Sequence, residues 1–222
     1  MLPKELSNGI CSLNPQEDRL AFSCLCELDK QGNITEYKFA KTVIRSRVKG
    51  VYSEINSLLA GSDDAELKEK YAEVSGQLPI INELADILYK NKKNRGCPEL
   101  ETSESKLIID DEDICVGVER RTRGRSEEII EDFMLVANEC AARFGMDNNL
   151  PFVYRIHEEP SDEKLESLRE ALVKLNVQYK LGEKACPGDM SEILKAAKGT
   201  DIDLIMNNIV LRNMSKNCRG YR

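Results

Sequence analysis

The chain lacks any hydrophobic run long enough to cross a membrane. No apolar stretch in its 222 residues approaches the roughly 20 residues that a membrane-spanning helix needs. The first residues also lack the basic and then apolar profile of a secretory signal peptide. We therefore expect neither a membrane protein nor a secreted precursor, and we predict a cytoplasmic location.

The sequence has one histidine, His157, and no cysteine pair at zinc-binding spacing. Zinc sites usually combine closely spaced thiols with a second pair of Cys or His ligands. The eight cysteines are scattered through a chain too large to be a small disulfide scaffold, which indicates reduced thiols. Cys24 and Cys26 stand in an alternating segment, so we expect both on one face of a strand.

Two kinds of catalytic site find little support in the residues alone. There is no G-x-S-x-G segment, so a serine triad would rest on His157 without a nucleophile elbow. Asp110–Asp113 groups the carboxylates that hard divalent metals require. Adjacent residues on a turn point in different directions, however, and no partner acid stands at metal-loop spacing. We interpret this acidic group as a solvated turn.

Charge limits any nucleic-acid interface to a local site. The chain has 32 Lys+Arg against 39 Asp+Glu, a net charge of −7, which argues against binding nucleic acid by bulk charge. The densest basic stretch, 119–125, holds four arginines, whose planar forks suit phosphate. The alternative is a solvated connection in which these arginines offset acidic neighbours. Without interleaved aromatic residues, the stretch by itself is weak evidence for nucleic-acid binding.

Hydrophobic periodicity predicts one α+β unit of mixed strands and helices, with no repeat and no long polar linker. Alternating residues indicate strands, and a 3.6-residue period indicates helices. In the first half of the chain we expect an irregular segment 1–18, a hairpin of strands 19–27 and 35–44, a helix 46–61, and a helix up to residue 94 that is capped by Asp63 or Asp64 and broken at Pro79. In the second half we expect extended pieces 99–101, 106–109 and 114–118, a helix 126–144 capped by Ser126, a buried strand 150–156, and helices 161–176, 189–198 and 201–215.

Several segments form an ordered set of motifs at consistent separations. They are M-L-P-K-E-L-S-N-G-I-C-S-L-N-P, Y-K-F-A-K-T-V-I-R-S-R-V-K-G-V-Y-S-E-I, R-G-C-P-E-L-E-T-S-E-S-K-L-I-I-D, I-I-E-D-F-M-L-V-A-N-E-C-A-A-R-F, L-P-F-V-Y-R-I-H-E-E-P-S-D-E-K-L and I-V-L-R-N-M-S-K. This set resembles the catalytic domain of the RNB-type exoribonucleases, the family of ribonuclease R and ribonuclease II, and is closer to ribonuclease R. The resemblance implies a partial RNB-type catalytic domain over 1–216, followed by an unrelated tail, 217–222.

The resemblance also implies an activity and two site residues. Members of this family are hydrolases that degrade single-stranded RNA processively from the 3′ end to 5′ mononucleotides, using Mg2+. By position, Tyr52 matches the family's catalytic tyrosine, which helps to set the scissile phosphate and the terminal nucleotide. Glu131 matches the glutamate that binds the 3′-terminal nucleotide. Leu100 falls at the base-clamping aromatic position, where an apolar contact would replace stacking worth roughly 1–3 kcal/mol per base.

One departure from the family pattern concerns the metal. The family's metal-binding aspartates lie upstream of the segment that Met1 matches, and Asp110–Asp113 does not align with them. We therefore expect no metal ligands in this chain, an internal fragment, and no activity in isolation, since the metal's charge stabilises the transition state. The alternatives are a non-catalytic RNA- or partner-binding module and a non-functional truncated remnant with bare apolar residues.

Overall fold

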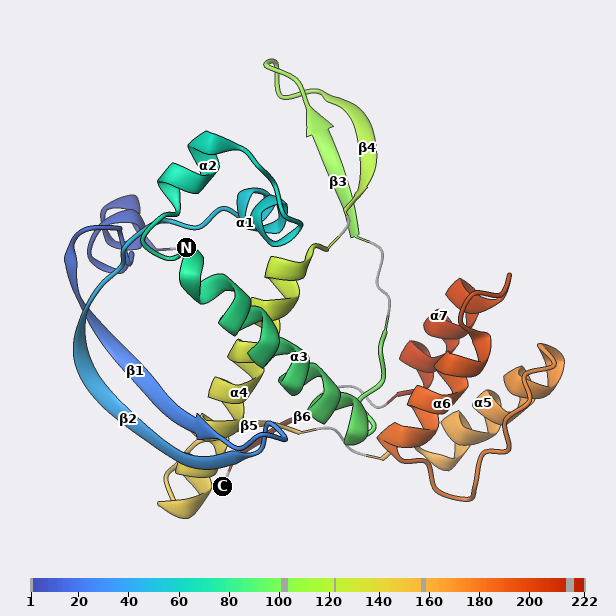
Figure 1. Ribbon diagram of the computed structural model, residues 1–222. Coiled ribbons are helices and arrows are strands. Elements are labelled where there is room, and N and C mark those ends of the chain that lie inside the picture. Colours follow the sequence, from blue (N-terminus) through green and yellow to red (C-terminus); the bar gives the residue numbers. More distant parts are fainter. Residues whose placement is uncertain (1, 101–103, 122, 157–158, 215–217, 222) are drawn as a thin grey trace. The chain divides into compact units, whose positions relative to one another are not determined.

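The predicted mixture of strands and helices is confirmed in the computed structural model, which describes residues 2–100, 104–121, 123–156, 159–214 and 218–221 (Figure 1). The strands pair in antiparallel twos, β1 with β2, β3 with β4 and β5 with β6. The elements are η1 (Leu6–Ile10), β1 (Asp18–Leu28), β2 (Ile34–Arg45), α1 (Tyr52–Leu59), α2 (Ala65–Lys70), η2 (Ser75–Gln77), α3 (Leu78–Asn94), β3 (Glu104–Ile109), β4 (Cys115–Arg121), α4 (Arg125–Asp147), β5 (Val153–Ile156), α5 (Asp162–Lys174), α6 (Pro187–Ala197), α7 (Asp203–Asn213) and β6 (Cys218–Tyr221).

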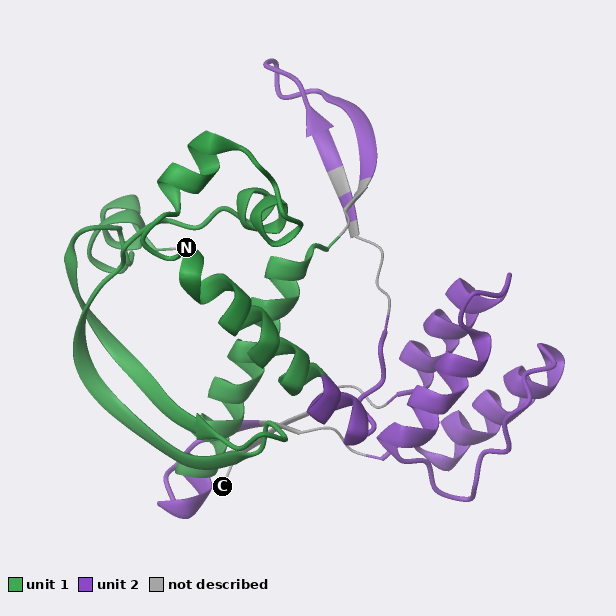
Figure 2. Ribbon diagram, viewed as in Figure 1, with its two compact units in different colours: residues 1–89, 123–144 green, residues 90–122, 145–222 purple. Residues whose placement is uncertain are grey.

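The chain divides into two units, each built from two separate segments (Figure 2). Unit 1 comprises residues 1–89 and 123–144, and unit 2 comprises residues 90–122 and 145–222. Unit 1 therefore contains the β1–β2 hairpin, α1, α2 and most of α3 and α4. Unit 2 contains the β3–β4 hairpin, the β5–β6 pair and the helices α5, α6 and α7.

The first hairpin, β1–β2, confirms the prediction from residue alternation. Its register runs from Asp18 opposite Arg45 to Leu28 opposite Ile34. Asp29 organises the turn, because its Oδ1 accepts hydrogen bonds from the main-chain amides of Gln31 and Asn33, at 2.9 and 2.8 Å. The turn chemistry of an aspartate followed by glycine and asparagine thus closes the hairpin locally.

The two thiols of β1 share one face, as predicted, and that face packs against α4. Cys140 of α4 is fully buried, and its Sγ lies 3.7 Å from that of Cys26. Burial, followed by the neighbouring thiols of Cys26 and Cys24, raises the pKa of Cys140 to about 12. These cysteines are free thiols that serve as small packing residues between strand and helix.

Helix α1 begins later than its periodicity predicts, so the expected start near Ser46 is wrong. The segment before it is held in another way. The carbonyl of Ser46 accepts a hydrogen bond from the Gln16 amide at 2.8 Å, and the carbonyl of Arg47 accepts one from the Gln16 side chain at 2.7 Å. Backbone groups used in this way cannot enter a helical ladder. The helix ends at Leu59, and Gly61, which was predicted to terminate it, follows two residues later with a positive φ of 85° that suits glycine.

The predicted long second helix is broken just before Pro79. Of the two aspartates expected to cap this helix, Asp64 is the cap of α2, since its Oδ1 accepts from the amides of Glu66 and Leu67 at 2.9 and 3.3 Å. After α2 the chain passes through the short turn η2 before α3 begins at Leu78. Pro79 therefore stands in the first turn of α3, where a missing amide proton costs little. Other boundaries also differ from the prediction, since residues 6–10 form the π-helical turn η1 within the segment expected to be irregular.

In unit 2, the β3–β4 hairpin surrounds the acidic group, which acts as a turn. Asp110 Oδ1 accepts hydrogen bonds from the main-chain amides of Glu112 and Ile114, each at 2.9 Å. This aspartate therefore serves the turn itself, which supports the interpretation as a solvated turn. The extended piece expected at 99–101 is wrong for Glu99 and Leu100, which lie outside any strand. Glu101 lies outside the described residues.

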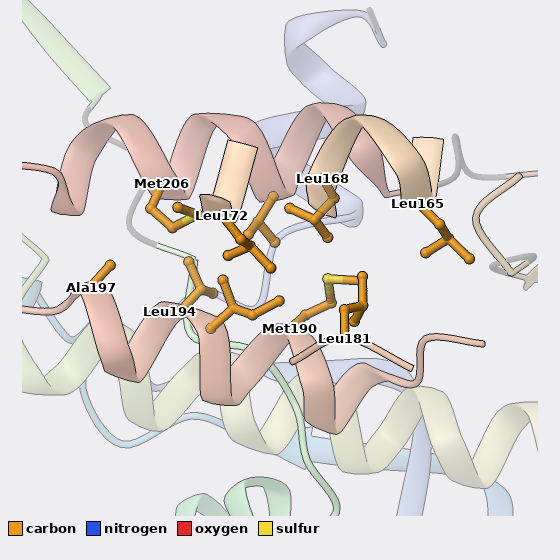
Figure 3. Close-up of a cluster of buried hydrophobic side chains, with 10 residues drawn as sticks. Leu165, Leu168, Leu172, Leu181, Met190, Leu194, Ala197 and Met206 are labelled. Carbon is orange, nitrogen blue, oxygen red and sulfur yellow. The ribbon is translucent and has the colours of Figure 1, made fainter. Parts of the chain in front are cut away.

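Helices α5, α6 and α7 enclose a hydrophobic core (Figure 3). Leucines at 3- and 4-residue spacing bring one face of α5 inward, as an amphipathic helix requires. Leu168, Ile193, Met206 and Val210 are completely buried in this cluster. Its buried members are Leu165, Leu168, Leu172, Leu181, Met190, Ile193, Leu194, Ala197, Met206 and Val210. The predicted helices are thus confirmed, with boundaries shifted by a few residues.

Strand β5 pairs with β6 near the end of the chain. The strand predicted at 150–156 begins only at Val153, and the expectation that it is buried is wrong there, since Val153 is 53% exposed. Residues 218–221 of the predicted tail form β6, for which the sequence pattern provided no expectation. Among the described residues, no helix combines the length and apolar character needed to cross a bilayer.

Candidate functional site

The two site residues suggested by the sequence both lie in unit 1. Tyr52 is the first residue of α1, and its side chain is 47% exposed. Glu131 lies in the second turn of α4, and its side chain is 49% exposed. Both side chains are therefore open to a ligand. Their relative placement depends on how the start of α1 meets the start of α4.

A group of hydrogen bonds joins the two helix starts, and we call these residues (Tyr52, Asn56, Ser126 and Glu127) the α1–α4 junction. The Ser126 amide donates to Asn56 Oδ1 at 2.7 Å, and the Ser126 hydroxyl donates to the main-chain oxygen of Tyr52 at 3.1 Å. Asn56 Nδ2 donates to Glu127 Oε2 at 3.0 Å. Ser126 is itself buried, with 5% exposure.

The junction changes the role that we expected for Ser126. The sequence pattern placed this serine before the helix as its N-cap, but α4 begins one residue earlier, at Arg125. The Ser126 hydroxyl therefore bonds to α1 instead of capping its own helix. Glu127 performs part of the capping, because its Oε2 accepts from the Gly124 amide at 3.1 Å. A glutamate at the third helical position that accepts this amide is half of a capping box.

Glu127 remains ionised in the junction. Partial burial by itself would raise the pKa of Glu127. Hydrogen bonds from Asn56, Ser126 and the Gly124 amide outweigh that effect and hold its pKa below the usual range. The junction thus contains a negative charge whose hydrogen-bond partners come from both helix starts.

Gly124 allows the two helix starts to approach closely. A Cβ at this position would lie 2.0 Å from Asn56 Nδ2 and 2.8 Å from Glu127 Oε2. A side chain there would therefore displace the amide that bridges the helices. Asn56, Glu127 and the neighbouring Gly124 were missed as site-forming residues in the sequence. An asparagine inside a helix is the signal that could have identified Asn56, because asparagine disfavours helix interiors.

Two arginines of the basic stretch pair with acidic neighbours. Arg123 Nη1 lies 3.1 Å from Glu131 Oε2. Arg125 binds α3, with its Nε 2.7 Å from Asn82 Oδ1 and its Nη2 2.5 Å from Asp86 Oδ1. For these two residues the alternative reading of the stretch, arginines that offset nearby acids, is supported. The side chains of the other two arginines in the stretch lie outside the described part of the chain.

Leu100 does not lie on an open surface. Its side chain packs against the core of α5–α7 in unit 2 and is partly buried. The apolar contact expected at this position is therefore made with the protein's own core. His157 lies outside the described residues, so its environment stays a matter of prediction.

The described residues do not fit a magnesium site. Within the described ranges, no three His, Cys, Asp or Glu side chains are grouped so that they could hold a metal ion. Mg2+ takes oxygen ligands from carboxylates and water in an octahedral arrangement, and Asp110 Oδ1 already accepts two hydrogen bonds within its own turn. We therefore derive no catalytic step through a metal from these residues. The site's chemistry, as described, is that of an exposed phenol, a carboxylate and a guanidinium beside a hydrogen-bonded junction.

The RNB domain model matches residues 1–218 of the sequence. The chain belongs to the RNB-domain family. It is 35% identical over 220 residues to ribonuclease R 1 of Lactococcus lactis and 34% identical over 216 residues to ribonuclease R of Escherichia coli. Each match covers 97% of this chain, and this chain spans about a quarter (26%) of the length of each relative.

The fold of the RNB-domain chain is also similar to that of a solved relative. The apo structure of Mycoplasma genitalium RNase R matches with a TM-score of 0.90 and 27% identity, covering 99% of this chain and 34% of the other. The same Mycoplasma protein has been solved with ribose-methylated single-stranded RNA and with double-stranded RNA, and these structures match with the same TM-score of 0.90. The fold expected from the sequence is thereby confirmed.

Proposed function

We propose that this chain is the RNA-end-positioning part of a 3′→5′ exoribonuclease that hydrolyses single-stranded RNA to 5′ mononucleotides. One observation carries the proposal: the RNB match over 1–218, in a fold close to that of an RNase R solved with RNA. The chain spans about a quarter of the length of its curated relatives. The proposal therefore assigns RNA hydrolysis to a complete RNB enzyme and assigns to this chain only the positioning of the RNA end.

Each exposed group of the site has a role in this proposal. The Tyr52 hydroxyl donates a hydrogen bond to a phosphate near the RNA 3′ end. The Glu131 carboxylate accepts hydrogen bonds from the hydroxyls of the terminal ribose. Arg123, which lies beside Glu131, provides positive charge for a phosphate oxygen. A local site of this kind is consistent with a chain whose net charge is −7.

We further propose that Mg2+ is the cofactor of the reaction and that this chain by itself does not hydrolyse RNA. Bound Mg2+ would stabilise negative charge on the attacking and leaving oxygens of the phosphodiester. The described residues do not group the carboxylates that such an ion requires. Tyr52, Glu131 and Arg123 position the RNA end, and none of them replaces that charge.

A binding and cleavage assay tests the proposal. Purified chain is incubated with 5′-labelled single-stranded RNA in Mg2+, and the affinity for linear RNA is compared with that for circular RNA of the same sequence. We expect tighter binding to the linear form, with no ladder of shortened products. Tyr52→Ala and Glu131→Gln should remove this preference for an end. Ser53→Ala and Glu128→Gln, at neighbouring exposed positions on the same helices, serve as matched controls.

The assay also decides between the proposal and its competitors. Equal affinity for linear and circular RNA would favour the second candidate, a non-catalytic RNA-binding module. This candidate needs no metal site, and no three metal-binding side chains are grouped among the described residues. A ladder of products would contradict the predicted inactivity. No binding, together with a broad and non-cooperative thermal transition, would indicate a non-functional remnant.

We also propose a cytoplasmic location. The seven cysteines that the structure describes are free thiols, and Cys26 and Cys140 remain unlinked although their sulfurs are close. Thiols in such positions are typical of a reducing compartment. Cell fractionation followed by immunodetection tests this location, and recovery in a membrane or secreted fraction would contradict it.

A further inference from the structure

We propose that Asn56 is a positioning residue for the RNA-end site, acting through its side-chain amide to set Tyr52 relative to Glu131. This inference rests on the function proposed above, because the role of Tyr52 and Glu131 at the RNA end is part of it. Asn56 itself is not assigned any contact with RNA.

The Asn56 amide bonds to two different groups of α4. Its oxygen accepts from the Ser126 amide at 2.7 Å, and its nitrogen donates to the Glu127 carboxylate at 3.0 Å. One partner is a donor and the other is an ionised acceptor. A side-chain amide presents both functions on adjacent atoms, whereas a carboxylate can only accept. The chemistry of the junction therefore specifies an amide at this position.

The bond to Ser126 also serves the helix. The first four amides of an α-helix have no partner within the helix, and a buried amide without a partner is costly. Ser126 is the second residue of α4 and is buried, so its amide cannot rely on bulk water. Asn56 supplies the missing acceptor from 70 residues earlier in the chain. The start of α4 is thereby bound to α1 and not only to its own turn.

The junction places the two proposed site residues at the ends of one short path. Asn56 lies four residues after Tyr52, one turn further along α1. Ser126 lies five residues before Glu131, which corresponds to about 7.5 Å along α4. The Ser126 hydroxyl closes the path by donating to the main-chain oxygen of Tyr52 at 3.1 Å. Because Asn56 and Ser126 bond directly, a shift of the amide changes the spacing between Tyr52 and Glu131.

The variant Asn56→Asp isolates this role with almost no change of shape. At pH 7 it places a second carboxylate against Glu127, which is held ionised, and like charges at this distance repel. We expect the ratio of affinities for linear and circular RNA to fall about tenfold at pH 7. Two carboxylates in contact raise the pKa of one of them, so lowering the pH should protonate that group and restore the preference.

The double variant Asn56→Asp/Glu127→Gln provides a rescue. It exchanges the amide and the carboxylate, so that the donor and acceptor again face each other and no like charges meet. We expect it to restore the preference at pH 7. Asn208→Asp is the matched control for an added charge, because Asn208 is exposed on α7 and its side chain donates within its own helix, to the Leu204 oxygen at 3.0 Å. The control should behave like the wild type at pH 7 and at lower pH.

A second measurement keeps the inference separate from the proposed function. The chain is labelled with 3-fluorotyrosine, and the Tyr52 signal in the 19F NMR spectrum is identified by its loss in Tyr52→Phe. In Asn56→Asp without RNA, we expect this signal to shift or split at pH 7 and to return at lower pH and in the double variant.

The outcomes separate cleanly. An unchanged Tyr52 signal overturns the inference, and so does a shifted signal that leaves RNA preference intact. A wild-type chain without preference for linear RNA overturns the proposed function. In that case the fluorine signal alone decides whether Asn56 sets the position of Tyr52.

Discussion

Arg123 and Glu131 form an ion pair in which the guanidinium Nη1 lies 3.1 Å from the carboxylate Oε2. Both side chains are about half exposed, at 54% and 49%, so water and salt screen their attraction. Exposed pairs of this kind contribute at most about 1 kcal/mol to stability. The pair therefore matters mainly because it holds a positive and a negative group together at the start of α4, beside the junction.

The first prediction concerns Arg123. The variant Arg123→Ala should lower the free energy of unfolding by less than about 1 kcal/mol. It should weaken RNA binding and reduce the slope of log affinity against log salt by about one, because one phosphate contact is lost. Urea titration and fluorescence anisotropy across a salt series measure these effects. The control is Lys174→Ala, which removes an exposed ion pair with Glu170 in unit 2 and should leave the salt slope unchanged. If Arg123→Ala also leaves the salt slope unchanged, Arg123 does not contact a phosphate.

A second prediction concerns the close approach at Gly124. The variant Gly124→Ala should lower the free energy of unfolding by about 1–3 kcal/mol, as is usual for overpacking, because the added Cβ would meet Asn56 Nδ2 at 2.0 Å. Gly76→Ala is the control, since a Cβ there meets nothing within 4 Å.

The same substitution gives a coupling test. In an Asn56→Ala background the obstructing amide is gone, so Gly124→Ala should cost clearly less than in the wild type. Urea unfolding of the four variants completes this double-mutant cycle. Equal costs in both backgrounds would show that Gly124 is required for a reason other than Asn56.

The third prediction concerns thiol reactivity. Only the thiolate reacts with iodoacetamide, and Cys140 is both fully buried and raised in pKa to about 12. In the folded chain at pH 8, exposed Cys11 and Cys97 should be alkylated while Cys140 remains unmodified. In urea, all should react. Peptide mass spectrometry after timed labelling measures this, and labelling of Cys140 at the rate of Cys97 in the folded chain would contradict the packing of α4 on β1.

The fourth prediction is a pH dependence centred on Tyr179 and Asp189 of unit 2. The Tyr179 hydroxyl donates to Asp189 Oδ1 at 2.6 Å; this bond and burial raise the pKa of Tyr179 to about 12, and the same bond holds the pKa of Asp189 below its usual range. A tyrosine with a raised pKa loses its contribution as the pH rises from about 10 towards 12. An aspartate with a lowered pKa loses its contribution as the pH falls below about 4.

Tyr179→Phe tests both limbs of this dependence. The variant should be less stable than the wild type near pH 7, and its stability should decline less steeply at both extremes. Cys140 adds its own decline above about pH 9 in both proteins, so the comparison is made as a difference between them. Thermal unfolding by circular dichroism from pH 3 to 11 provides the curves, and parallel curves would show that the bond does not contribute.

The fifth prediction concerns an exposed apolar pair on the first hairpin. Leu20 and Val43 face each other across β1 and β2 and are 86% and 65% exposed, with Phe22 close by at 70%. Apolar patches of this kind favour self-association. Leu20→Thr/Val43→Thr, which keeps strand propensity, should raise the monomer fraction in light scattering without lowering the melting temperature. Lys38→Thr on β2 is the control, and an unchanged monomer fraction would show that this patch does not drive association.

Local patterns predicted the regular elements well where local chemistry decides them. The β1–β2 hairpin follows from alternation and from the hydrogen bonds that Asp29 makes within its own turn. Asp64 capped α2 as expected for the same reason. The start of α1 was misplaced because Gln16, which is far from it in the sequence, bonds to the carbonyls of Ser46 and Arg47. Hydrophobic periodicity gives no information about such hydrogen bonds between distant residues.

In the candidate site, too, some residues could be predicted from the sequence and others could not. Tyr52 and Glu131 could be named from motifs that resemble a family, and the family membership is confirmed by the match over residues 1–218. Their assigned roles stay predictions. The residues that join the two helices were not predicted. Ser126 was expected to cap α4, but its amide and hydroxyl bond to Asn56 and Tyr52 of α1.

The sequence by itself determined the family of this chain, its hairpins and most of its helices, because turn residues, caps and hydrophobic periods act over only a few positions. Only the tertiary structure decided where the polar groups of Asn56, Ser126 and Glu127 find their partners. Those bonds join residues 70 and 71 positions apart. They form only when the two helix starts approach so closely that a side chain at Gly124 would clash with Asn56. Such partners depend on packing, which no local pattern encodes.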